Sequence, residues 1–403
     1  MSSENIVPEF QNDHNVYILG AGFSYEAGYP LVPNFMEKMR EAASWQKDHS
    51  QETKEIEAVL KFRLEAASAA YRVNFDPENV EDLFSLTAAT ETSTNIANRN
   101  MVIAIAETLD YCRYNSKTER KLIFPGAGQS PPKGFERDNP ANPTNLTIDR
   151  FKFYVGHMVG VWGETPYRDN TFITFNYDLL LEEALQKWEI PFRYDGLHGT
   201  PMVKYDQSAK ELEENANLED VVFLLKLHGS MNWSLDQLPK PNHIFYDFKD
   251  VPIRSYQAGG AQELLLAPPV WDKGTARIGH PLSGIWSNAI RKIQTATRII
   301  VIGYSLPLAD AHFRYLMAAG LQNNISLREI VFVNPAFRGG DSGKEADKKA
   351  LEERVFSVFK RDLHKKGILK LLPFTTYEFF FPFVAKEINT DDILGRKYPL
   401  PFR

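Results

Sequence analysis

Short apolar runs recur along the chain, and several of them end in a polar or glycine-rich cluster. Their length and their content of Val, Ile, Leu and Phe predict buried strands. These strands are Val16–Leu19, Thr171–Phe175, Val221–Leu227, Leu264–Pro269, Arg298–Ile302 and Glu329–Val333. Helical spacing of apolar positions separates them at Val32–Ala43, Leu179–Trp188 and Ala309–Leu321. Strands that alternate with helices predict an α/β fold with a doubly wound, mostly parallel, Rossmann-like sheet.

The pattern between residues 45 and 165 differs from this alternation. Apolar positions recur every three to four residues in Glu55–Tyr71 and Met101–Cys112, and Asn79 is placed to cap a further short helix. Residues Phe124–Asn145 are rich in Gly, Pro and Asn and predict an exposed loop. We therefore expect a helical insertion at 45–165, after the first strand unit.

The region after the last predicted strand carries charge and aromatic residues. An amphipathic pattern predicts a helix at about Lys344–Lys366, and the aromatic stretch Tyr377–Phe381 is interpreted as an added strand or a subunit contact. We expect residues 340–403 to form a helical and aromatic extension of one domain that spans residues 1–403.

Charge and cysteine content narrow the function classes. The net charge of −6 gives no general attraction to nucleic acid, so we expect no direct nucleic-acid binding. The one cysteine, Cys112, excludes an intrachain disulfide and a cysteine-rich zinc site, and we expect it to pack a helix. Residues Met1–Asp13 lack the features of a signal peptide, and no apolar run approaches the roughly 20 residues that span a bilayer. A cytoplasmic protein without a membrane segment is expected.

Five polar or glycine-rich clusters follow five of the predicted strands. They are Gly20-Ala21-Gly22-Phe23-Ser24, Thr174-Phe175-Asn176-Tyr177-Asp178, Leu227-His228-Gly229-Ser230, Ile302-Gly303-Tyr304-Ser305 and Val333-Asn334-Pro335. Ligands of an open parallel sheet bind beyond the carboxyl ends of its strands, so the clusters predict one shared site.

Two of these side chains suit hydrolytic chemistry. The Asn176 amide offers donors and an acceptor, and it could hold a water and a substrate hydroxyl together. His228 could act as a general base near neutral pH, although a hydrogen-bonded core histidine is the alternative. Asp178 either orients the same groups or caps the helix that begins near Leu179.

The glycine cluster at Gly20 and Gly22 has two interpretations. Glycine lets backbone N–H groups approach a pyrophosphate closely, and Ser24 adds a hydroxyl; a strand-to-helix turn that needs only a positive φ is the alternative. No acidic residue follows about 20 residues later at a strand end, so the pattern is not that of an ordinary dehydrogenase.

A serine α/β-hydrolase is a rival hypothesis. Gly303-Tyr304-Ser305 resembles a nucleophile elbow, with Asp310, His312 and His364 as candidate partners, but Pro307 replaces the second glycine. No metal is predicted, because the remaining histidines and the carboxylates of Glu211–Asp220 share no metal-ligand spacing. Those histidines are His14, His49, His157, His198, His243 and His280.

Taken in order, the five clusters resemble the NAD-binding core of the sirtuin superfamily. Gly20, Ala21, Gly22 and Ser24 match its first glycine loop. Thr174, Asn176 and Asp178 match the first, third and fifth residues of its Thr-Gln-Asn-Ile-Asp motif, and His228-Gly229 matches its catalytic His-Gly. Gly303 and Ser305 match its Gly-Thr-Ser loop, and Asn334 matches the asparagine that contacts the ribose.

The departures from that family are informative. Two Cys-x-x-Cys pairs that bind zinc are absent, Pro30-Leu31-Val32-Pro33 stands where the family has Pro-Asp-Phe-Arg, and Phe175 replaces a glutamine. The combination resembles the zinc-free bacterial sirtuin-like domains of antiphage defence, which hydrolyse NAD. The stretches Leu266–Lys273 and Gly303–Asp310 are similar to that branch as well.

The resemblance implies an NAD glycohydrolase with NAD as substrate and no zinc. It implies catalytic roles for Asn176, His228 and Asp178, and cofactor binding by Gly20, Ala21, Gly22, Ser24, Gly303, Ser305 and Asn334. A homo-oligomer and a HerA-type ATPase partner are also implied. The alternative is a non-catalytic subunit that senses NAD or ADP-ribose within an assembly.

Overall fold

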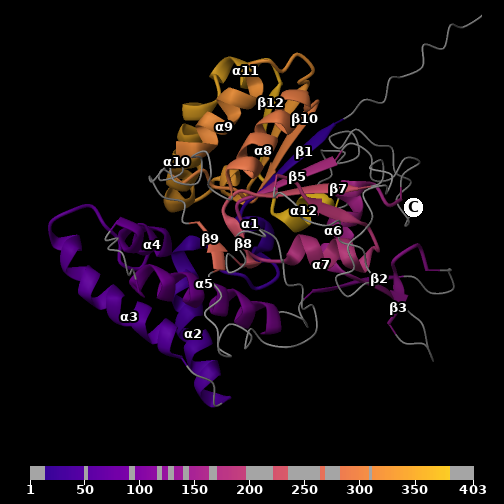
Figure 1. Ribbon diagram of the computed structural model, residues 1–403. Helices are drawn as coiled ribbons and strands as arrows, with labels where there is room; N and C mark the ends of the chain where they lie inside the picture. Colours follow the sequence, from indigo (N-terminus) through magenta and orange to yellow (C-terminus); the bar gives the residue numbers. More distant parts are fainter. Residues whose placement is uncertain are drawn as a thin grey trace, which may run out of the picture.

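A seven-stranded parallel sheet forms the centre of the computed structural model (Figure 1). The structure describes residues 14–49, 53–89, 96–115, 120–125, 131–138, 145–162, 170–196, 221–234, 264–267, 282–307 and 311–381. The strands are β1 (Asn15–Leu19), β5 (Asn170–Thr174), β6 (Phe192–Tyr194), β7 (Val222–Lys226), β10 (Arg298–Ile302), β11 (Glu329–Val333) and β12 (Leu369–Leu372). Their order is β12-β11-β10-β1-β5-β7-β6, with every neighbouring pair parallel. The predicted fold class is confirmed.

Helices surround this sheet, as a parallel sheet that is buried on both faces requires. They are α6 (Arg150–Val159), α7 (Leu180–Lys187), α8 (Ser283–Thr295), α9 (Ala311–Leu321), α10 (Ser342–Val358), α11 (Arg361–Lys365) and α12 (Thr376–Phe380). Helix α6 packs against α7, and α8 packs against α9. All five residues of β1 are buried, which explains why its sequence is apolar rather than alternating.

The strand order places a ligand crevice beside β1. The chain passes from β1 to β5 on one side and later reaches β10 on the other side. Crossovers that diverge from a central strand leave a crevice at the carboxyl ends of the strands where they part. Gly20 follows β1 and Gly303 follows β10, so both loops border this crevice.

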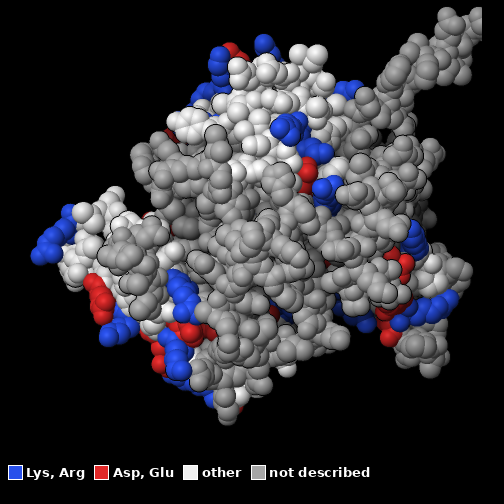
Figure 2. All heavy atoms as spheres, viewed as in Figure 1, with Lys and Arg blue, Asp and Glu red and all other residues white. Residues whose placement is uncertain are grey.

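Four helices of the described residues between 35 and 115 form a layer beside the sheet (Figure 1). They are α2 (Phe35–Asp48), α3 (Lys54–Ala66), α4 (Val80–Ala89) and α5 (Ile96–Asn115), and α2 and α3 both pack on α5. As predicted, Asn79 caps α4, because its side-chain oxygen accepts from the N–H groups of Glu81 and Asp82. Acidic and basic side chains lie side by side on the surface of this layer (Figure 2), where for example Arg40 pairs with Glu78 at 2.7 Å.

Part of the predicted exposed loop at Phe124–Asn145 is ordered strand instead. Strands β2 (Lys121–Pro125), β3 (Glu136–Arg137) and β4 (Asn145–Asp149) form an antiparallel sheet in the order β2-β4-β3. Phe135 is 6% exposed and its ring contacts those of Phe124 and Phe153. A few aromatic side chains within a Gly- and Pro-rich segment were enough to anchor it.

Several predicted element boundaries change in the structure. The first glycine loop enters a short helix, α1 (Ala21–Tyr25), and the segment predicted as a helix at Val32–Ala43 starts as the 3₁₀ turn Val32–Asn34 before α2. The helix predicted at Lys344–Lys366 is divided into α10 and α11, because Phe359 and Lys360 adopt extended backbone angles. A second, two-stranded antiparallel sheet pairs β8 (Gly229–Ser234) with β9 (Leu264–Leu266).

The aromatic stretch Tyr377–Phe381 is not an added strand, so that interpretation is wrong, whereas the alternative of a subunit contact stays a prediction. The stretch forms α12, which Thr375 and Glu378 start with reciprocal capping hydrogen bonds. The adjacent rings of Phe379 and Phe380 are both buried, which a strand with one buried face could not achieve.

Candidate active site

A cavity of about 730 Å³ opens at the carboxyl ends of the sheet strands. This volume is typical of a site for a small molecule or cofactor. The cavity is lined by nine of the residues that the sequence singles out: Ala21, Gly22, Ser24, Asn176, Asp178, His228, Gly303, Ser305 and Asn334. Gly20 is not among the lining residues, but its carbonyl oxygen accepts from Asn176. The structure therefore brings the amide and the imidazole to the same cavity.

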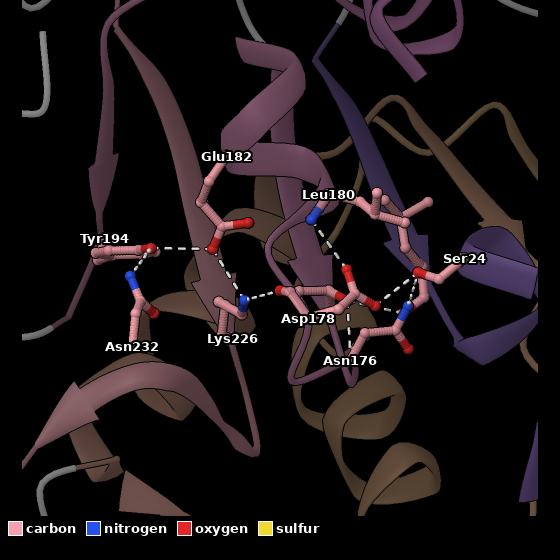
Figure 3. A network of polar contacts seen from close by, with 10 residues as sticks. Ser24, Asn176, Asp178, Leu180, Glu182, Tyr194, Lys226 and Asn232 are labelled. Atoms are coloured by element: carbon pink, nitrogen blue, oxygen red, sulfur yellow. Dashed lines mark hydrogen bonds and ion pairs between the residues drawn. The ribbon is translucent and has the colours of Figure 1, made fainter. Parts of the chain in front are cut away.

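Three of these side chains form a hydrogen-bonded chain across β1 and β5 (Figure 3). The Asn176 side-chain nitrogen donates to the Gly20 carbonyl oxygen at 2.9 Å and to Ser24 Oγ at 3.0 Å. Ser24 Oγ donates in turn to Asp178 Oδ2 at 2.7 Å. Both donors of the amide are thereby engaged, and Asn176 Oδ1 is the atom left to accept a hydrogen bond.

Asp178 combines the two roles that the sequence left open. Its Oδ1 accepts from the backbone N–H of Leu180, the first residue of α7, at 3.1 Å, while Oδ2 accepts from Ser24 Oγ. The residue is 8% exposed. One carboxylate thus ties the start of a helix to the orientation of Asn176.

A buried ion pair between Lys226 and Glu182 supports the loop that carries Asp178 (Figure 3), and it was not predicted from the sequence. Lys226 Nζ lies 2.8 Å from Glu182 Oε1 and also donates to the backbone carbonyl of Asp178. Tyr194 donates to the same Glu182 oxygen at 2.9 Å. Burial raises the pKa of Glu182 above the usual carboxyl value, whereas Lys226 acts in the opposite direction. The sequence feature that could have revealed this ion pair is a lysine, Lys226, inside the otherwise apolar run Val221–Leu227.

His228 follows β7 and is 7% exposed. Its ring packs edge-on against Phe175, with centroids 5.1 Å apart, and lies 6.3 Å from the ring of Tyr177. Its backbone carbonyl accepts from the N–H of Ala267 at 2.8 Å, and Gly229 with φ of 86° lets β8 turn back towards β9. The imidazole is held by packing at the cavity wall.

The glycine loops after β1 and β10 pack backbone against backbone. A Cβ at Gly20 would lie 2.6 Å from the Cα of Tyr304, and one at Gly22 would lie 2.8 Å from the Cα of Gly303. The Gly22 N–H donates to the Gly303 carbonyl at 2.8 Å. Gly303 has a positive φ, but Gly20 is extended, and Gly22 lies within α1. Close approach of the two loops, rather than a positive φ, therefore explains the first glycine cluster.

Ser305 and Asn334 line the same cavity. Asn334 Oδ1 caps the 3₁₀ turn Pro335–Arg338 by accepting from the Ala336 N–H at 3.0 Å. Ser305 is exposed, and its hydroxyl makes no hydrogen bond to any described residue. Its carbonyl accepts from Arg354 Nε at 2.9 Å.

The serine-hydrolase hypothesis gains no support from this arrangement. His364 Nδ1 is hydrogen-bonded to the Leu369 carbonyl at 2.8 Å, and the His312 ring lies against Trp286 with centroids 5.6 Å apart. The candidate acid, Asp310, lies outside the described residues. A nucleophile needs a base within hydrogen-bond reach, and no described residue supplies one to Ser305.

Tyr29 is a further lining residue that sequence analysis missed. It is 2% exposed, and its hydroxyl has no hydrogen-bond partner among the described residues. Burial raises its pKa well above the usual value, and the negative charges of Glu183 and Asp178 add to this, so the phenol stays protonated. A buried hydroxyl without a partner is costly, which makes it a candidate ligand contact.

Helices from the region 45–165 complete the cavity. Val80 and Phe84 of α4 and Ile105 and Leu109 of α5 line it with apolar side chains that are 1–6% exposed. The same helix α5 carries Cys112, which is 3% exposed and whose pKa burial raises to about 12. A buried thiol that stays protonated is a poor nucleophile, so Cys112 contributes to the packing of the helix.

The described residues contain no group of three or more His, Cys, Asp or Glu side chains placed to hold a metal ion. None of the helices resolved there has both the length and the apolar content to cross a bilayer.

Comparison with known proteins links much of this site to one family. Residues 170–357, which contain Asn176, His228, Ser305 and Asn334, match the family described as SIR2-like domain. This part of the chain is therefore similar to SIR2-like domains. No curated protein matches the chain.

Solved structures with some similarity to the chain include Sir2 proteins. One, on the mechanism and regulation of Sir2 enzymes, is 14% identical, with 88% of this chain and 95% of that chain covered and a TM-score of 0.31. Another, a Sir2 homologue mutant with 2′-O-acetyl ADP ribose, is 14% identical, with 96% and 94% covered and a TM-score of 0.32. Likeness at this level does not bear on activity.

Proposed function

We propose that this protein is an NAD glycohydrolase that converts NAD and water to nicotinamide and ADP-ribose. The observation that carries the proposal is the shared cavity of Asn176 and His228, which extends to Gly303, Ser305 and Asn334. The SIR2-like match over residues 170–357 and the ordered sirtuin motifs support it.

The reaction breaks the bond between nicotinamide N1 and ribose C1′. The bonding electron pair leaves with nicotinamide, and the oxygen of water bonds to C1′. The leaving group is already cationic, so the transition state carries oxocarbenium charge on the ribose. Hydrolysis therefore requires a held ribose, a positioned water and a group that takes the proton of that water.

Asn176 would position the water. Its amide nitrogen donates to the Gly20 carbonyl and to Ser24 Oγ, so its Oδ1 would accept a hydrogen bond from that water. Asp178 fixes the arrangement through Ser24. Preorganised groups of this kind need no rearrangement when the transition state forms.

His228 would act as the general base on the water or on a ribose hydroxyl. An imidazole nitrogen can take a proton from water and release it again, which suits that role. The rings of Phe175 and Tyr177 contact the imidazole and restrict its movement. The proton then passes to solvent after nicotinamide has left.

Asp178 and the nearby Tyr29 would support the nicotinamide end. The Tyr29 hydroxyl lacks a partner among the described residues and remains a donor, and a carboxamide oxygen is an acceptor of suitable chemistry. Gly20, Ala21, Gly22, Ser24, Gly303, Ser305 and Asn334 would hold the rest of the dinucleotide.

The biological role rests on the resemblance alone. We propose an effector of antiphage defence that depletes NAD in the cytoplasm, acts as a homo-oligomer and has a HerA-type ATPase as partner. Neither zinc nor nucleic acid takes part in the proposed reaction.

Release of nicotinamide from NAD tests the proposal, both for the protein alone and with an ATPase partner. Asn176→Ala and His228→Ala should each lower turnover about a hundredfold or more, because each removes a group that acts in the transition state. Asn323→Ala is a matched control, since Asn323 is exposed and is not a lining residue of the cavity. Turnover like that of the wild type in both variants would overturn these assignments. NAD binding without nicotinamide release would favour the non-catalytic sensing subunit.

A further inference from the structure

We propose that Arg354 binds a phosphate group of the ligand and so selects phosphorylated adenosine ligands, an inference that rests on the proposed dinucleotide site. Arg354 lies on α10 and lines the cavity together with Asp347, Ala350 and Leu351, which share its helix face. That helix packs against the 3₁₀ turn after Asn334. The guanidinium is thus at the end of the cavity assigned to the adenosine ribose.

The hydrogen bonding of Arg354 leaves the two terminal nitrogens of its guanidinium available to donate. Its Nε donates to the Ser305 carbonyl at 2.9 Å, and the guanidinium makes no other hydrogen bond or ion pair with the described residues. One bond anchors the planar group while both terminal nitrogens remain to donate. Paired N–H donors in a fixed plane match two phosphate oxygens.

The charge distribution of the cavity points to the same chemistry. Arg354 is the one lysine or arginine among its described lining residues, whereas Glu26, Glu81, Asp178 and Asp347 are acidic. A dinucleotide diphosphate would enter this acidic cavity with two further negative charges. Without a cation its binding would be opposed by like charges.

The acidic residues nearby do not neutralise Arg354 fully. Glu26 is already engaged by Arg150 and by the hydroxyl of Tyr154. Burial lowers the pKa of Arg354 below its usual value, and Asp347 only partly opposes this. A partly buried cation without an ion-pair partner among the described residues would gain from contact with an incoming anion.

Two phosphate sources fit this geometry. One is the diphosphate that every NAD-like ligand carries, and the other is a 2′-phosphate on the adenosine ribose, as in NADP. The Arg354 fork could take either, because both present tetrahedral oxygens close to the ribose that Asn334 would contact.

Equilibrium binding to the full-length protein distinguishes these sources. The ligands are ADP-ribose, its 2′-phosphate and adenosine, and the variants are Arg354→Met, Arg354→Lys and the exposed control Arg314→Met. We expect Arg354→Met to weaken ADP-ribose binding at least tenfold and to leave adenosine unchanged, with an intermediate loss in Arg354→Lys. A loss confined to the 2′-phosphate ligand would instead support the ribose phosphate as the group bound.

Two outcomes overturn the inference. Equal affinity of wild type and Arg354→Met for both phosphorylated ligands would refute the role of Arg354 alone. No binding of ADP-ribose to the wild type would refute it together with the proposed function. By contrast, weakened ADP-ribose binding in Arg354→Met, with no nicotinamide release by the wild type, would support Arg354 and contradict hydrolysis. Thermal unfolding of each variant verifies that the fold is retained.

Discussion

The cavity has two walls of opposite character. The strand-end wall consists of Ser24, Asn176, Asp178 and His228, whose first three side chains are joined by hydrogen bonds. The helical wall consists of Val80, Phe84, Ile105 and Leu109 from α4 and α5, all buried and apolar. The first wall supplies groups that can react, whereas the second can only give shape and exclude water.

Three charged side chains hold the two walls together. Glu183 of α7 accepts from Arg120 at 2.7 Å and from Arg113 of α5 at 2.5 Å. The carboxylate thus joins the helical layer to α7, the helix that follows Asp178. Substitutions at this junction should affect the whole molecule, while substitutions within one wall should affect either stability or ligand chemistry.

Glu183→Gln should have the largest effect on stability. It removes the negative charge of a carboxylate that pairs with two largely buried arginines, which costs about 3–5 kcal/mol of unfolding free energy. Urea unfolding at neutral pH measures this loss, and Glu353→Gln on the exposed face of α10 is the control. A loss no larger than that of the control would show that the junction is unimportant.

The same carboxylate predicts a pH dependence. Burial acts to raise the pKa of Glu183, but Arg120 and Arg113 outweigh it, and the pKa is lowered from the usual value. A carboxyl group whose pKa is lower in the folded state than in the unfolded chain stabilises the fold at pH values above its unfolded pKa. This stabilisation is lost as the pH falls through the folded pKa. Wild type should therefore lose more unfolding free energy than Glu183→Gln when the pH is reduced from neutral to about 4. Parallel losses in the two proteins would contradict this assignment.

Ile105→Val in the helical wall should have a moderate effect on stability and none on chemistry. Removal of one buried methylene costs about 1 kcal/mol of unfolding free energy. Ile103→Val, in the same helix but outside the cavity lining, is the matched control. Both variants should unfold at lower urea concentration with the kcat of the wild type. A tenfold drop in kcat for Ile105→Val alone would mean that the helical wall takes part in the reaction.

Tyr29→Phe should change ligand binding rather than stability, and its effect on the unfolding free energy should be the smallest of these variants. The substitution removes a buried hydroxyl without a partner among the described residues, so the unfolding free energy should stay constant or rise by up to about 1 kcal/mol. Product inhibition by nicotinamide should weaken about fivefold, since one hydrogen bond of about 1 kcal/mol is lost. A clear loss of stability with unchanged nicotinamide inhibition would assign Tyr29 a structural role.

The strand-end wall could be predicted from the sequence because its residues follow recognisable strands. Asn176 and His228 come directly after apolar runs, and parallel strands end at one edge of the sheet. Their convergence therefore followed once the sheet was predicted. For Asp178, capping and support of the site were proposed as alternatives, but its two oxygens do both.

The residues that were missed depend on neighbours far away in the chain. The carbonyl that anchors Arg354 belongs to Ser305, and the buried lysine Lys226 pairs with Glu182 of another element. Tyr29 lies in a segment without a strand or helix pattern, so nothing local marked it. Aromatic content alone also could not distinguish a strand from helix α12, whose start depends on the capping pair of Thr375 and Glu378.

A crystal structure of the His228→Ala protein with NAD bound tests the central claim most directly. The account predicts that the nicotinamide ribose lies between Asn176 and position 228, with a water on Asn176 Oδ1 facing C1′. NAD bound with this ribose away from Asn176, or bound outside the cavity, would contradict it.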